Sequence, residues 1–147
     1  MNQVKIKIKK LIPEAIIPNY SHDGDAGMDV YSTINFILKS RHRTAIPTGL
    51  SMEIPKGYEV QVRPKSGLAI KFGVTVLNTP GTIDSGYRGE VKVILVNHSS
   101  EDYEIKKGEK IAQIVLAKYE TAQIVEAEDL SGTARGEGGF GSTGLKQ

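Results

Sequence analysis

Segment 63–69 (Arg-Pro-Lys-Ser-Gly-Leu-Ala) is a candidate phosphate-binding loop. It places two cations and a hydroxyl at the expected start of a short helix. We predict that this helix spans 67–72, with Ser66 as its N-cap and Gly73 in a left-handed C-terminal cap. The exposed N–H groups at a helix start bind phosphate. A capped helix beside a solvated loop is an equally good interpretation of these residues alone.

Carboxylates occur in two further segments. Segment 81–90 carries Asp84 and Tyr87 among glycines that allow close backbone approach, so Asp84 could hold a water as a general base. A polar hairpin is the simpler interpretation of an isolated aspartate in a turn. The second carboxylate group surrounds an Ala-Gly pair and consists of Asp23, Asp25 and Asp29. Such a group could bind a hard cation directly or through water, although turn formation explains the first two equally well.

The segment from Arg135 to Gly144 is rich in glycine, with glycine at five of its ten positions. We expect it to be mobile when nothing holds it. Its backbone amides and Arg135 could wrap an anion, and Phe140 could stack on a planar group. The Gly-x-Gly-x-x-Gly pattern at 136–141 is not a dinucleotide fingerprint, because it opens no helix in a βαβ unit. Composition alone favours a disordered tail.

Composition excludes several classes of protein and partner. The formal net charge is +2 and the charges alternate in sign along much of the chain, so we expect no nucleic-acid partner. The chain has no cysteine, which excludes disulfides and thiolate metal sites. No apolar run approaches the roughly 20 residues that cross a bilayer, and residues 1–10 alternate like a strand rather than a secretory signal. We therefore expect a soluble protein without a membrane partner.

Short β-branched stretches dominate the chain, most with two-residue alternation and turn signals between them. The predicted strands are 4–8, 58–62, 74–77, 91–96, 111–116 and 123–125. No long amphipathic helix is available to cover a parallel sheet, so the sequence predicts one all-β domain, a sandwich, barrel or jelly roll. We expect this domain to span 1–134 and a flexible glycine-rich lid to span 135–147.

Five segments of the chain resemble, in the same order, the five motifs of the trimeric dUTPase family, and the resemblance covers nearly the whole chain. The matching segments are 26–30, 63–69, 81–90, 108–113 and 135–144. The resemblance implies a β jelly-roll (β-clip-like) homotrimer whose active sites lie between subunits, each tail crossing from a neighbour. It implies Mg²⁺-dependent hydrolysis of dUTP to dUMP and pyrophosphate, which limits uracil incorporation into DNA and supplies dUMP for thymidylate synthesis. The implied location is cytoplasmic, or more broadly intracellular or nuclear in a eukaryotic or viral setting.

The resemblance also implies individual roles. Asp84 would orient or deprotonate the water that attacks the α-phosphorus, and Asp29 would help hold hydrated Mg²⁺ through water. Asn78 and hairpin backbone groups would pair with uracil, while Tyr87 would lie under the deoxyribose and exclude a 2′-hydroxyl. Phe140 would stack over the uracil when the tail closes. The implied triphosphate contacts are Lys65, Ser66, Gly67, Gln113 and Arg135. The other implied substrate contacts are Thr82, Gly141 and Ser142.

Three positions depart from the family pattern. Lys65 stands where arginine is most frequent, which keeps the charge but loses the bidentate fork. Gly86 occupies a place often held by aspartate, and Met28 one that is often aromatic or polar.

Three alternatives to a dUTPase are also compatible with parts of the sequence. The nearest is a deoxycytidine triphosphate deaminase, or a bifunctional deaminase and dUTPase, of the same fold, for which Glu90 is the only nearby glutamate. The second is a trimeric, non-catalytic nucleotide-responsive protein. The third is a merely structural β trimer, which leaves the order of the motifs unexplained.

Overall fold

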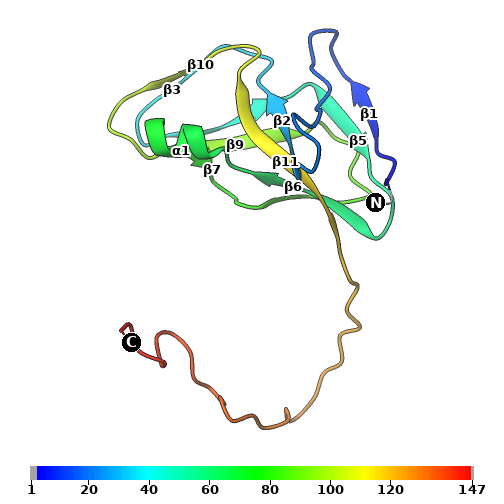
Figure 1. The fold of residues 1–147 in the computed structure, drawn as a ribbon, viewed down its shortest axis with the longest axis vertical. Coiled ribbons are helices and arrows are strands. Elements are labelled where there is room, and N and C mark those ends of the chain that lie inside the picture. The colour runs from blue at the N-terminus through cyan, green and yellow to red at the C-terminus, as the bar shows by residue number, and fades with distance from the viewer. Residues whose placement is uncertain (1–2, 147) are drawn as a thin grey trace.

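The computed structural model describes residues 3–146 (Figure 1). Eleven strands and one short helix make up its regular structure, which confirms the predicted all-β class. In chain order, the elements are β1 (Lys7–Lys10), β2 (Gly27–Tyr31), β3 (Phe36–Leu38), β4 (Arg43–Pro47), β5 (Leu50–Glu53), β6 (Tyr58–Arg63), α1 (Ser66–Phe72), β7 (Val74–Val76), β8 (Gly81–Ile83), β9 (Lys92–Asn97), β10 (Tyr103–Ile105) and β11 (Lys110–Lys118).

All strand pairs are antiparallel and form four sheets. The largest has the order β2-β11-β6-β8, the next β4-β9-β7, and two are pairs, β1-β5 and β10-β3. Alternating residues of the strands, such as Val60 and Val62 of β6 and Val93 and Leu95 of β9, are buried in one hydrophobic core. In these strands, the two-residue alternation of apolar side chains therefore marks the face of the sheet that is buried in the core. This arrangement is the expected jelly-roll fold.

Helix α1 begins one residue earlier than predicted. Lys65 is its N-cap, with extended backbone angles (φ −99°, ψ 127°), and the Lys65 carbonyl accepts the first helical hydrogen bond from Ala69 N–H at 3.1 Å. The prediction that Ser66 caps the helix is thus wrong, since Ser66 is its first helical residue. The C-terminal prediction is confirmed: Gly73 adopts a left-handed conformation (φ 65°) that few other residues adopt readily.

The predicted strand at 123–125 is wrong. Residues 119–130 contain no strand, and the side chains of Ile124 and Val125 are 87% and 73% exposed. A β-branched run becomes a strand only where a second strand offers its hydrogen bonds, and within residues 3–146 none lies beside this segment. The predicted strand at 4–8 is displaced toward the C-terminus, to Lys7–Lys10, where it pairs with β5.

After β11, the chain leaves the body of the protein and follows a wide arc that carries the red segment before residue 147 far from the sheets (Figure 1). Neither helix nor strand occurs in the described part of this segment, 119–146. Over the described residues as a whole, no helix is long and apolar enough to cross a membrane.

Candidate active site

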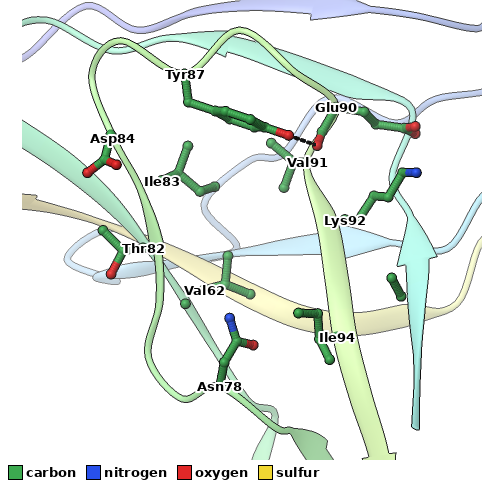
Figure 2. A pocket seen from close by; sticks show the side chains of 12 residues that line it. Val62, Asn78, Thr82, Ile83, Asp84, Tyr87, Glu90, Val91, Lys92 and Ile94 are labelled. Carbon is green, nitrogen blue, oxygen red and sulfur yellow. Dashed lines mark hydrogen bonds between the residues drawn. The ribbon is translucent and has the colours of Figure 1, made fainter.

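A cavity of about 290 Å³ lies between the 78–87 segment and strand β9 (Figure 2). Four of the predicted substrate residues line it: Asn78, Thr82, Asp84 and Tyr87. Its remaining walls are largely aliphatic, including Ile83, Val91 and Ile94. A pocket of mostly apolar walls with a few polar groups suits a small planar ring that carries hydrogen-bonding edges.

Strand β8 holds this cavity against the main sheet. Its register with β6 pairs Gly81 with Val62 and Ile83 with Val60. A Cβ at Gly81 would lie 3.1 Å from the Cβ of Val62 and 3.5 Å from Nδ2 of Asn78, so glycine lets β8 lie close to β6 and to the Asn78 amide. The sequence predicted Asn78 and Thr82 as site residues, but not that β8 would hold them at the edge of a sheet.

Asp84 follows β8 directly and begins a turn in which its carbonyl accepts a hydrogen bond from Tyr87 N–H at 3.1 Å. The residue is exposed at the cavity, and no hydrogen bond or ion pair to its carboxylate occurs within residues 3–146. Both carboxylate oxygens are therefore available to a water, as general-base catalysis requires.

A second group of predicted residues lies elsewhere on the same sheet. The register places Asp29 of β2 opposite Gln113 of β11, and Gln113 opposite Arg63 of β6. The Gln113 side chain donates through Nε2 to the carbonyl of Pro64 at 3.0 Å, just before Lys65 and α1. A Cβ at Gly27 would lie 2.3 Å from Oε1 of Gln113, so this glycine makes room for the amide.

Asp29 is largely buried between two ammonium groups. Lys65 Nζ donates to its Oδ1, and Lys110 Nζ lies 3.2 Å from its Oδ2. Burial acts to raise the pKa of Asp29, but the hydrogen bonds and positive charges of Lys65 and Lys110 outweigh it and hold the pKa below the ordinary value. Lys110 was not among the site residues predicted from the sequence. Its only signal was its place in segment 108–113, because the contact depends on the irregular register between β11 and β2.

This pair of contacts predicts a pH-dependent stability. A carboxyl whose pKa is lowered by folding stabilises the protein above its unfolded pKa of about 3.9, and that stability is lost as pH falls through the folded pKa. Asp29→Asn should therefore lower the free energy of unfolding at neutral pH, with the difference from wild type shrinking below about pH 4. Urea unfolding without Mg²⁺, at neutral pH and below about pH 4, measures the free energy of unfolding of wild type and variant, with Asp23→Asn as the control. A difference that stays constant into acid would contradict the expectation.

The predicted tail residues lie apart from both groups. Arg135 donates through Nε to the carbonyl of Gly138 at 2.8 Å, within the tail itself. The Phe140 side chain is fully exposed. Gly141 and Ser142 are part of segment 135–146, which follows the arc away from the sheets (Figure 1). A single chain in this conformation therefore does not bring the tail to the cavity.

Asp84 and Asp29 lie far apart within one chain. Three strand spacings and four residues along the strands separate them in the order β2-β11-β6-β8. With ordinary sheet dimensions this places them roughly 20 Å apart. One chain thus carries the cavity beside Asp84 at one place and a polar cluster at another. This second group, the lysine-rich cluster, consists of Asp29, Lys65, Lys110 and Gln113.

Comparison with known proteins relates the chain to one family. The sequence profile of the dUTPase family matches residues 13–144. A deoxyuridine 5′-triphosphate nucleotidohydrolase of Nautilia profundicola is 60% identical over 141 residues, which cover 96% of this chain and 99% of that protein. The corresponding protein of Clostridium acetobutylicum is 51% identical over 144 residues, covering 98% and 99%.

A solved structure gives the same result. The dUTPase of Staphylococcus bacteriophage 80alpha, in complex with dUPNHPP, is 28% identical and superposes with a TM-score of 0.89 over 96% of this chain and 99% of that one. Sequence and fold agree over almost the full length, and the chain belongs to the dUTPase family.

Proposed function

We propose that this chain hydrolyses dUTP to dUMP and pyrophosphate, with Asp84 activating the attacking water. The observation that carries the proposal is the cavity that gathers Asn78, Thr82, Asp84 and Tyr87 in a chain of the dUTPase family. Because the substrate is an intracellular nucleotide, we also propose that the chain works inside the cell.

In the proposed reaction, the uracil enters the cavity and meets the Asn78 amide, which offers both a donor and an acceptor. Asp84 accepts a proton from a water whose oxygen forms a bond to the α-phosphorus. The bond from that phosphorus to the bridging oxygen breaks, and pyrophosphate leaves with the electron pair. Tyr87 supports the deoxyribose.

The lysine-rich cluster is the proposed triphosphate site. Lys65 supplies positive charge beside the Ser66 hydroxyl and the backbone amides of Ser66 and Gly67. The Gln113 side chain is held against the same segment by its hydrogen bond to the Pro64 carbonyl. Arg135 of the tail would bind the far end of the triphosphate, where its planar fork suits phosphate oxygens. Positioning and charge neutralisation dominate phosphoryl-group chemistry, so these residues lower the barrier without covalent steps.

Asp29 is the residue that would hold Mg²⁺. No group of three or more histidine or carboxylate side chains suited to a metal occurs within residues 3–146. Magnesium ordinarily keeps several waters and uses one or two carboxylates together with substrate phosphates, so a single carboxylate beside the triphosphate fits the ion. Because both Asp29 oxygens already meet lysines, this contact would pass through water. Bound Mg²⁺ would neutralise charge on the triphosphate.

The separation of roughly 20 Å between Asp84 and Asp29 argues for a shared site. A general base must come within hydrogen-bonding reach of the attacking water. The cavity and the lysine-rich cluster of one chain therefore do not bind the same dUTP molecule. We propose a homotrimer in which one subunit supplies the cavity, a second the cluster and a third the tail. Closed threefold symmetry then builds three equal sites.

Co-expression of two inactive variants tests this sharing. One chain carries Asp84→Asn, and the other carries Asp29→Asn with Lys65→Ala. In a cyclic trimer, every mixed assembly keeps one intact site, so random mixing at equal amounts should restore about a quarter of wild-type activity. Each variant expressed alone is the control. Activity of the mixture no higher than that of the controls would show that each site belongs to one chain.

The proposed activity is tested by measuring pyrophosphate release from dUTP, dCTP, dTTP and UTP, with and without Mg²⁺, together with ammonia release. Release from dUTP alone, dependent on Mg²⁺, is the expected result. Ammonia from dCTP would instead favour the deaminase. The structure argues against that alternative, because Glu90 accepts a hydrogen bond from Gly49 N–H at 2.9 Å and so has a structural task. Binding of dUTP without turnover would indicate a regulatory protein.

A further inference from the structure

The Tyr87 ring is held in place by two residues of its own loop, which connects β8 to β9. Its hydroxyl donates to the carbonyl of Glu90 at 2.8 Å (Figure 2). The ring also lies directly against Gly89, where a Cβ would stand 2.4 Å from the tyrosine hydroxyl oxygen, 2.6 Å from Cζ and 2.8 Å from Cε1. A side chain at position 89 is therefore incompatible with the present position of the ring.

The backbone under the ring is itself braced by segment 48–51. Gly49 N–H donates to Glu90 Oε2 at 2.9 Å, Ser51 Oγ donates to the Arg88 carbonyl at 2.6 Å, and Thr48 Oγ1 donates to the Val91 carbonyl at 2.6 Å. Thr48 and Ser51 are buried. Buried, satisfied hydrogen bonds fix geometry because breaking one leaves a desolvated polar group.

Gly49 is fixed in turn. Its φ is +71°, and a Cβ there would lie 2.9 Å from the Cβ of Ala15 and 3.0 Å from Cγ1 of Ile12. A residue with a side chain would be strained in this conformation and would collide with the N-terminal loop. The N–H that meets Glu90 therefore has little freedom to move.

We infer that Gly89 and Glu90 are positioning residues for the discrimination between deoxyribose and ribose. They act by fixing the position and orientation of the Tyr87 ring relative to the bound sugar. The inference rests on the proposed function, in which that ring supports the sugar. A 2′-hydroxyl is rejected only if the ring does not yield by the width of one oxygen atom. The close contact of the ring with Gly89 and its hydrogen bond to the Glu90 carbonyl oppose that movement.

The test compares Gly89→Ala with Gly86→Ala. Both add one methyl group to the same loop between β8 and β9, but a Cβ at Gly86 meets nothing within 4 Å. Gly89→Ala should lower the ratio of kcat/KM for dUTP over UTP by about tenfold or more, the scale of one steric contact in a pocket, and Gly86→Ala should leave it unchanged. Equal ratios in wild type and Gly89→Ala would overturn the inference.

A double-variant cycle separates positioning from general damage. If Gly89 acts through the ring, adding Gly89→Ala to Tyr87→Ala should not change the dUTP/UTP ratio further. An additional loss of the same size in that background would show that Gly89 acts by another route, and would overturn the inference. If Gly89→Ala does not fold, Glu90→Ala and Glu90→Gln replace it. Alanine removes the acceptor for Gly49 N–H and should lower the ratio, whereas glutamine retains an acceptor and should restore it.

The wild-type measurement distinguishes the two levels of proposal. Wild type that releases no pyrophosphate from dUTP refutes the proposed function. Wild type that is active and selective, with all Gly89 and Glu90 variants equally selective, refutes only the inference.

Discussion

Asp84→Asn should reduce pyrophosphate release from dUTP by about 10²–10⁴-fold, the usual contribution of a general base, while dUTP still binds. The amide keeps the size of the carboxylate but does not accept a proton from water. Nothing in residues 3–146 bonds to the Asp84 carboxylate, so the substitution removes no structural contact there. The measurement is a kcat from pyrophosphate release, together with the Kd for a non-hydrolysable dUTP analogue.

Asp23→Asn is the matched control for this variant. It makes the same chemical change in an exposed turn outside the cavity, and it should keep wild-type kcat. Near-normal turnover of Asp84→Asn would remove Asp84 from the role of base. A large rise in Kd with unchanged kcat would make it a binding residue instead.

Removal of residues 135–147 should lower kcat/KM for dUTP by about 10³-fold, because a single arginine can contribute on this scale to phosphoryl transfer. The shortened chain also loses Phe140 and the glycine-rich cover that would exclude water. The β-sheets should remain folded, since residues 135–146 hydrogen-bond only with one another and with Thr133, which lies outside the sheets. Steady-state kinetics and light scattering of the shortened chain test both statements.

A shorter deletion of residues 145–147 is the control. It retains Arg135, Phe140 and every glycine of the tail, and the dUTPase profile ends at 144. We expect wild-type kinetics from it. A fully active chain without 135–147 would refute the role of the tail as a lid, whereas loss of the oligomer would give the tail a structural role.

Four strands were predictable from the sequence because their buried positions are occupied by β-branched and other apolar residues. The predicted ranges 58–62, 74–77, 91–96 and 111–116 fall on β6, β7, β9 and β11 with small differences at the ends. Strands such as β2, β3, β4 and β5 were not predicted. In runs of three to five residues, alternation alone does not distinguish a strand from the loop beside it, and the short β7 was found because all three of its residues are β-branched.

Where prediction failed, the deciding partner lay elsewhere in the chain. The 123–125 segment has strand-forming residues, yet no strand of the body pairs with it. Ser66 resembles an N-cap, but the Lys65 carbonyl already accepts the first helical hydrogen bond. Local composition indicates a propensity for a helix or strand. Whether that helix or strand forms depends on hydrogen-bond partners that the rest of the fold supplies.

The candidate site shows the same division. Residue types and motif order sufficed to name Asp84, Tyr87 and Gln113 as candidates. Their separation into two groups required the strand order β2-β11-β6-β8, which brings distant parts of the sequence together. The contact of Lys110 with Asp29 and the fit of the Tyr87 ring on Gly89 depend on side-chain geometry, which no spacing rule contains.

The long arc of residues 120–146, clear of the sheets, makes the proposed enzyme easy to switch off by proteolysis. Exposed segments without secondary structure are where proteases cut first, and a cut between 120 and 134 would release Arg135 and Phe140 while leaving the β-sheets folded. In the proposed trimer each tail serves one site. Successive cuts would then reduce activity in steps of one third, and the loss would be permanent without any unfolding.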